Sequence, residues 1–114
     1  MDKKEKKRAF KRKLEDFQYF LADRVGYYDL IISQDLLNYA RLVGRRENAE
    51  DSAICFVANK DYVSKSMKPI KIGDILYPGS HGRPTRKSPG NIFEPNSYMI
   101  LFDRYGIKPQ QRTF

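Results

Sequence analysis

Large apolar residues recur at a helical spacing in the first quarter of the chain. Phe10, Leu14, Phe17 and Leu21 follow one another at steps of four, three and four residues, which brings their side chains onto one face of an α-helix. The pattern predicts an amphipathic helix over residues 3–25. A glycine comes next, and because glycine readily takes the left-handed conformation that closes a helix, we expect the helix to end there.

A second stretch also fits a helix. Ser33 is suited to cap the N-terminus of a helix and Gly44 to follow its last turn. The pattern predicts a second helix over residues 34–43. Its inward-facing side chains would be Leu36, Leu37, Ala40 and Val43.

The rest of the chain has the composition of a β region. Residues 53–58, 70–77 and 98–102 are rich in β-branched and aromatic side chains and predict three strands, the second with a turn or bulge at Gly73. Residues 78–90 hold three glycines, three prolines and a net charge of +3, so we expect them to leave the sheet as a loop. Its guanidinium groups, hydroxyls and flexible backbone favour a phosphate clamp, and the alternative is a mobile, solvated hairpin.

The order of these elements predicts an α+β fold with two N-terminal helices packed on a small, mainly antiparallel β-sheet. A length of 114 residues suits one domain. We expect that domain to span residues 14–105, with a basic N-terminal extension over residues 1–13 continuous with the first helix and a C-terminal tail over residues 106–114.

The positive charge is concentrated at the start of the chain. Residues 1–13 carry eight cations and two acids, while the other 101 residues carry fourteen cations and twelve acids. A concentrated positive segment binds polyanions because it releases their condensed counterions. This pattern predicts a nucleic-acid ligand. We expect no cofactor.

The single cysteine and the hydropathy pattern indicate the compartment. Cys55 lies inside an apolar run and has no second cysteine in the chain to pair with, which favours a buried thiol in a reducing, cytoplasmic setting. No segment approaches the roughly 20 apolar residues that span a bilayer, so we expect no membrane partner.

Catalytic and metal-binding patterns are weak. His81 is the only histidine and has no neighbouring acid to orient it, and no spacing of His, Cys, Asp and Glu indicates a metal site. We therefore expect a binding protein rather than an enzyme. The alternative is a small metal-independent ribonuclease toxin that uses His81, Arg83, Arg86 and a tyrosine such as Tyr98 on an RNA phosphodiester.

Three segments carry a family resemblance. Residues 33–42 (SQDLLNYARL) are close to a pattern of acid-Gln-Leu-Leu-x-Tyr-Ala-Gln that follows an initial helix in ArdC-type antirestriction proteins and related mobile-element proteins. Residues 68–73 occupy the place of that family's basic-x-Gly turn, and residues 100–103 are similar to its hydrophobic-Phe-Asp strand. The resemblance to the family's N-terminal domain spans about residues 14–105. It implies contact with single-stranded DNA and an origin in a mobile element or phage.

Together these observations predict a nucleic-acid-binding accessory protein whose basic helix and basic loop converge on a phosphate backbone. The pattern favours DNA over RNA without deciding between them, and it leaves open whether the ligand is single or double stranded. The alternative is a protein-interaction module, such as an anti-defence inhibitor, that docks on a host complex. The pattern leaves the oligomeric state open. The residues expected to contact nucleic acid are Lys6, Lys7, Arg8, Lys11, Arg12, His81, Arg83, Arg86, Lys87 and Tyr98.

Overall fold

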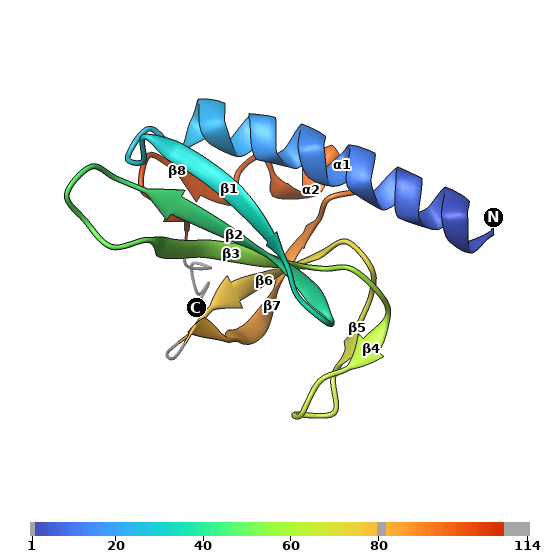
Figure 1. Cartoon of the computed structure of the whole chain (residues 1–114). Coiled ribbons are helices and arrows are strands. Elements are labelled where there is room, and N and C mark those ends of the chain that lie inside the picture. Colours follow the sequence, from blue (N-terminus) through green and yellow to red (C-terminus); the bar gives the residue numbers. More distant parts are fainter. Residues whose placement is uncertain (1, 80–81, 109–114) are drawn as a thin grey trace.

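The computed structural model describes residues 2–79 and 82–108. One long helix, α1 (Lys3–Arg24), precedes a series of short strands (Figure 1). The α+β class predicted from the sequence is confirmed, with one N-terminal helix in place of two. The remaining elements are β1 (Leu30–Asp35), β2 (Tyr39–Arg45), β3 (Ser52–Ala58), β4 (Tyr62–Val63), β5 (Pro69–Ile70), β6 (Asp74–Pro78), β7 (Pro84–Asn91), α2 (Pro95–Tyr98), β8 (Phe102–Asp103) and β9 (Gly106–Ile107).

The helix α1 forms where the sequence predicts it. Its N-cap is Asp2, whose carboxylate accepts a hydrogen bond of 2.8 Å from the backbone N–H of Glu5. At the other end Val25 turns into extended backbone, while its N–H still donates to Leu21 O at 2.8 Å. The helix therefore ends through this extended residue, and Gly26 does not take the expected left-handed conformation.

Five strands form the main sheet in the order β1-β2-β3-β6-β7, with every neighbouring pair antiparallel. The β4–β5 hairpin is inserted between β3 and β6, and β8 pairs with β9. Figure 1 shows α1 lying across one face of the sheet. The main core fills the space between them, and a smaller cluster around Phe56 and Leu76 covers the opposite face.

The predicted helix over residues 34–43 is wrong, because this stretch is the end of β1, a tight turn and most of β2. The Leu36 N–H donates to Tyr39 O at 2.9 Å and closes the hairpin. Ala40 and Leu42 belong to the main core while Tyr39 packs against the opposite face. This alternation has the period of a strand. Pairing with β3 places β2 inside the sheet, so that side chains on both of its faces are packed. An isolated helix over the same residues would not bury both sets.

Two further predictions about the β region are also wrong. Most of the loop predicted over residues 78–90 is β7, which lies at the edge of the sheet, where a strand tolerates proline because one side of its backbone has no ladder partner. The strand predicted over residues 98–102 is the end of α2, a turn and the start of β8.

The strand predicted over residues 53–58 is confirmed as β3. The prediction over residues 70–77 is confirmed in part, since β5 and β6 are divided by a turn with Gly73 at φ +89°.

Candidate functional site

The first half of α1 is only loosely attached to the fold. Leu14, Phe17 and Leu21 are buried against the sheet, Phe10 is half-buried, and no large apolar residue precedes Phe10 in the helix. Figure 1 shows the N-terminal turns continuing past the strands. The packing that fixes the second half of α1 therefore does not hold the first half close to the sheet.

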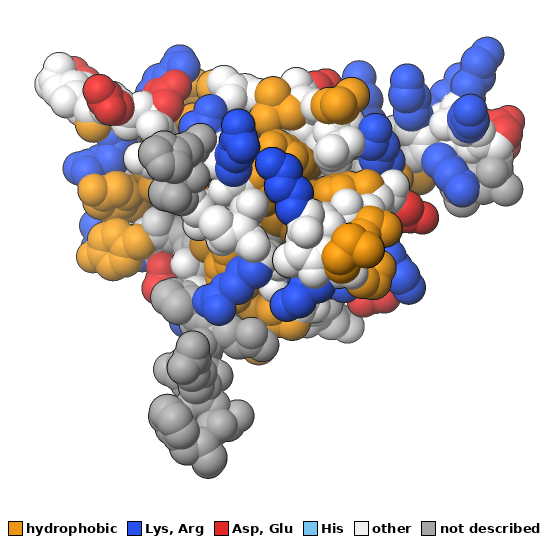
Figure 2. All heavy atoms as spheres, turned by 90° about the horizontal axis from the view of Figure 1, so that it is seen from below, with side chains coloured by type: hydrophobic (Ala, Val, Ile, Leu, Met, Phe, Trp, Pro, Cys, Tyr) orange, Lys and Arg blue, Asp and Glu red, His pale blue; other side chains and the backbone are white. Residues whose placement is uncertain are grey.

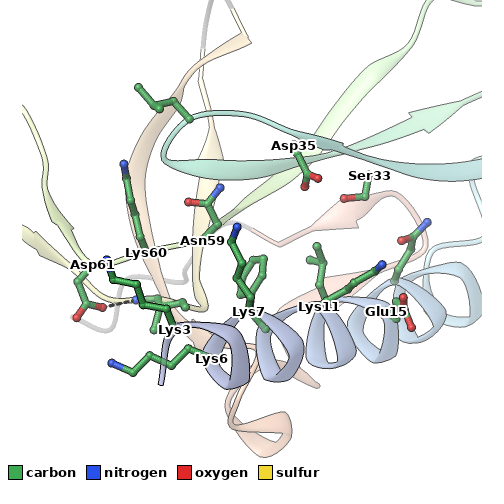
Figure 3. A pocket seen from close by; sticks show the side chains of 15 residues that line it. Lys3, Lys6, Lys7, Lys11, Glu15, Ser33, Asp35, Asn59, Lys60 and Asp61 are labelled. Carbon is green, nitrogen blue, oxygen red and sulfur yellow. Dashed lines mark hydrogen bonds between the residues drawn. The ribbon is translucent and has the colours of Figure 1, made fainter. Parts of the chain in front are cut away.

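A groove of about 910 Å³ separates this part of α1 from the sheet (Figure 3). The helix forms one wall, and the end of β1, the β1–β2 turn and residues 59–61 form the other. The helix wall contributes Lys3, Lys6, Lys7, Phe10, Lys11, Leu14, Glu15 and Gln18, and the facing wall contributes Ser33, Asp35, Leu37, Asn59, Lys60, Asp61 and Ile72.

The charges in the groove are unevenly divided between the walls. Four of the five lysines belong to α1, while Asp35 and Asp61 belong to the facing wall. Figure 3 shows Lys7 reaching toward Asn59 on that wall, while Lys11 extends along the helix below Ser33 and Asp35. Asp61 is already engaged, because its carboxylate accepts the Ile72 N–H at 2.8 Å. The groove therefore has a cationic rim on the helix side, and carboxylates and other hydrogen-bonding groups on the sheet side.

A second set of cations points away from the groove. Lys4, Arg8 and Arg12 follow at steps of four residues, are exposed and do not line the groove. They form what we call the outer ridge. Among residues 2–79 and 82–108, no cation of α1 has a carboxylate within ion-pair distance. Both the groove side and the outer ridge are thus open to an external anion.

The structure does not bring the two predicted basic segments together. The start of β7 lies on the left of Figure 1 and the N-terminal turns of α1 on the right. Figure 2, which views the face opposite α1, shows Lys and Arg side chains dispersed among hydrophobic ones, and the helix N-terminus projecting at one side with several cations. The convergence expected between the helix and the loop is therefore absent from the described residues.

Two of the predicted site residues near β7, Arg86 and Lys87, have partners within the fold. The Arg86 guanidinium lies 4.9 Å from the centre of the Tyr77 ring, and Lys87 Nζ lies 3.2 Å from a carboxylate oxygen of Asp74. Arg83 is exposed just before the strand. His81 lies outside the described residues.

The predicted role of Tyr98 in contacting nucleic acid does not agree with its position in the structure. Its side chain is buried in the main core, with its ring centre 4.8 Å from that of Phe17. Burial, with a smaller effect of the nearby Asp16 carboxylate, raises the pKa of its phenol. The ring is not available for stacking on a base, and the residues proposed for a ribonuclease are not assembled in the described part of the chain.

The sequence interpretation missed part of the cationic surface. Lys3 and Lys4 extend the two helical rows of cations by one turn, and Lys60 reaches the groove from the other wall. Their positions in the helical repeat contain the signal for Lys3 and Lys4. Lys60 gives no such local signal, because it is placed by the pairing of β3 with β2 and by the Asn59 side-chain amide, which donates to Leu36 O at 2.9 Å.

An aromatic cluster lies near the C-terminal end of α1. The Arg46 guanidinium sits 4.0 Å from the Tyr27 ring centre and donates to the Tyr27 hydroxyl, and the Tyr105 ring centre lies 5.4 Å from that of Tyr27. Tyr105 is 63% exposed. Exposed tyrosines of this kind, rather than Tyr98, are the rings that an unpaired base can reach.

Comparison with protein-family models, curated proteins and solved structures finds no match. The resemblance to ArdC-type antirestriction proteins stays a prediction, and residues 33–42, which carry it, lie in a β-hairpin here. No helix in the described residues is long and apolar enough to cross a membrane. Residues 2–79 and 82–108 contain no cluster of three or more His, Cys, Asp or Glu that could hold a metal ion.

Proposed function

We propose that this protein is a nucleic-acid-binding accessory protein that holds a phosphate backbone with the first half of α1. The observation that carries the proposal is the state of the helix cations. They extend beyond the sheet, and no carboxylate in the described residues neutralises them. Such unpaired cations release condensed counterions from a polynucleotide when they meet its phosphates.

The outer ridge suits the backbone of duplex DNA. Lys4, Arg8 and Arg12 are one turn apart, which places successive cations about 6 Å from each other along the helix axis. This spacing is close to the separation of consecutive phosphates along a strand. A helix about 10–12 Å across also fits the major groove of B-form DNA, which is about 12 Å wide, whereas the major groove of A-form RNA is too narrow. The proposal therefore favours DNA over RNA.

The proposed origin in a mobile element or phage, in an antirestriction role, rests on the sequence resemblance alone. The proposed cytoplasmic location rests on the cysteine. Neither is needed for the binding chemistry, and both are separate proposals. Tyr98, the tyrosine named for the ribonuclease alternative, is in the core, so no observation in the described residues favours that alternative.

Fluorescence anisotropy tests the proposal with a labelled 20-base-pair duplex, its single strand and the RNA equivalent. We expect duplex binding that weakens with salt, with a slope of log affinity against log salt of about −3 for three or four phosphate contacts. The triple variant Lys4→Ala, Arg8→Ala, Arg12→Ala should lose about one unit of slope per cation that contacts a phosphate.

The variant Arg83→Ala, Arg86→Ala serves as the control, because β7 lies away from the helix N-terminus. It should bind nearly as well as the unmodified chain. The proposal is wrong if no nucleic acid binds, if binding is insensitive to salt, or if the control loses as much affinity as the triple variant.

A further inference from the structure

The strand β1 is an edge of the main sheet, and its outer side faces the region of α1. The turn hydrogen bond from Leu36 N–H to Tyr39 O fixes the alternation along the hairpin. Backbone groups of Gln34 and Ile32 pair with Arg41 and Val43, so those of the alternate residues point outward. The backbone N–H and C=O groups of Ile31, Ser33 and Asp35 therefore point outward, away from β2.

One of these outward groups already has a partner supplied by α1. The side-chain amide of Gln18 donates to Ile31 O at 2.9 Å. This contact occupies the edge of β1 at Ile31. Further along β1 the helix diverges, and Ser33 and Asp35 line the groove instead. The described residues contain no strand that pairs with them.

The groove thus combines an open strand edge, apolar side chains and a cationic rim. Phe10, Leu14, Leu37 and Ile72 supply apolar surface in the groove, and Leu37 is 83% exposed. Lys3, Lys7 and Lys11 occupy the opposite wall in one helical row. An extended peptide that pairs with β1 would place alternate side chains toward this wall.

We propose that this groove binds an extended acidic segment of a partner protein as an additional antiparallel or parallel strand on β1. The backbone of Ser33 and Asp35 supplies the main-chain hydrogen bonds, and the lysine row pairs with the acidic side chains that point toward α1. The side chains that alternate with them point away from the helix. This docking is independent of the DNA contact, which uses the outer ridge.

The test uses isotope-labelled full-length protein and a synthetic peptide, acetyl-(Glu-Val)4-amide, followed by NMR titration. We expect saturable binding with shifts at the Ser33 and Asp35 amides and slowed hydrogen exchange at both. The peptide acetyl-(Lys-Val)4-amide, with the opposite charge, should not bind.

Two charge-matched variants separate the groove from the outer ridge. Lys3→Ala, Lys7→Ala, Lys11→Ala should weaken peptide binding about tenfold or more, since it removes the three ion pairs. Lys4→Ala, Arg8→Ala, Arg12→Ala changes the net charge by the same amount and should leave the peptide affinity within about twofold. Equal losses in the two variants would overturn the proposal.

Removing main-chain donors tests strand addition itself. Ser33→Pro deletes an outward N–H without touching the bonds to β2, and should abolish the slowed exchange and most of the binding, while Ser33→Ala should not.

Peptides N-methylated on all glutamates or on all valines leave the protein unchanged, so they do not depend on the variant folding. We expect one of these two peptides to bind and the other to fail, because alternate N–H groups of a strand point to opposite sides.

Further results would also overturn the proposal. They are the absence of saturable binding, binding without shifts at Ser33 and Asp35, equal binding by the two methylated peptides, and a free protein that sediments as a dimer paired through β1.

A single-stranded octathymidylate is titrated in parallel. If it perturbs the Ser33 and Asp35 amides and displaces the peptide, the groove belongs to the nucleic-acid site and the peptide proposal is wrong. Loss of duplex binding in the outer-ridge variant tests the DNA proposal separately.

Discussion

Lys87 and Asp74 form an ion pair across β6 and β7, with Nζ of the lysine 3.2 Å from Oδ2 of the carboxylate. Asp74 is 3% exposed. Its two oxygens also accept hydrogen bonds from the Lys71 N–H at 2.8 Å and from the Asn91 side-chain amide at 3.0 Å. The buried charge is therefore satisfied from three directions, and it ties the turn before β6 to the far end of β7.

This arrangement predicts unequal effects when either partner is removed. Asp74→Ala should lower the free energy of unfolding by about 2–4 kcal/mol, because it leaves the Lys71 N–H without an acceptor and the Asn91 side-chain amide with the Ile72 carbonyl alone. Lys87→Met should cost about 1 kcal/mol or less, because the lysine is partly exposed and Asp74 keeps its other two donors.

Urea denaturation of the two variants checks the difference. Lys87→Met should also leave nucleic-acid affinity nearly unchanged, since Asp74 already engages this lysine. Equal destabilisation by the two substitutions, or a large loss of nucleic-acid affinity in Lys87→Met, would contradict the interpretation.

The elements predicted well from the sequence are those that one local pattern determines. For α1, the helical repeat of large apolar residues indicates the helix, and no strand period competes with it. Residues 34–43 differ, because their apolar positions fit both a helix and a hairpin. The choice is made by pairing with β3, the next strand along the chain, which lies outside residues 34–43. A reading of local periodicity lacks that information.

The candidate site was predictable in charge and unpredictable in shape. The row of cations from Lys3 to Arg12 is present in the sequence, and its two helical faces follow from the spacing. The groove depends on the divergence of α1 from β1 and on the position of residues 59–61, both of which arise from packing between distant segments. The expected convergence with β7 failed for the same reason, since charge alone does not place two segments on one side.

A close contact between Gly44 and Tyr28 gives a test of the β1–β2 hairpin. The Tyr28 ring occupies the space that a side chain at position 44 would need. Gly44→Ala should therefore lower the free energy of unfolding by about 1–3 kcal/mol through overpacking. Measured by urea denaturation, the double variant Gly44→Ala, Tyr28→Ala should lose less than the sum of the two single losses. Losses that simply add would show that residues 28 and 44 do not interact, which would contradict the overpacking.

The buried thiol of Cys55 predicts a loss of stability in alkaline solution. Burial raises the pKa of Cys55 above its ordinary value, so the thiol stays protonated in the folded chain while the unfolded thiol ionises above about pH 8.5. The stabilising contribution is complete below that pH and declines as the pH rises toward the pKa of the folded thiol. Between pH 7.5 and 9.5 the free energy of unfolding should fall by about 1–1.5 kcal/mol.

Denaturation curves of Cys55→Ala provide the comparison for this alkaline effect. The variant should be less stable at pH 7.5 because of the cavity it creates, and it should lose little further stability by pH 9.5. The same decline with pH in the variant would assign the effect to another group.

The hydrogen bond from Glu5 N–H to the Asp2 carboxylate predicts a local rather than a global role for the N-cap of α1. Cations crowd the first turns and oppose the helix dipole, so Asp2 is the main local group that stabilises this end. Asp2→Ala should speed amide exchange in residues 3–8 by a factor that corresponds to about 1 kcal/mol, and Asp2→Asn, which keeps an oxygen acceptor, should have a smaller effect. The urea midpoint should stay nearly unchanged, because the buried anchors begin at Leu14, beyond the affected turns. A shift of the whole unfolding transition in Asp2→Ala would mean that the first turns fold together with the core, and that the first half of α1 is held to the sheet more firmly than its packing indicates.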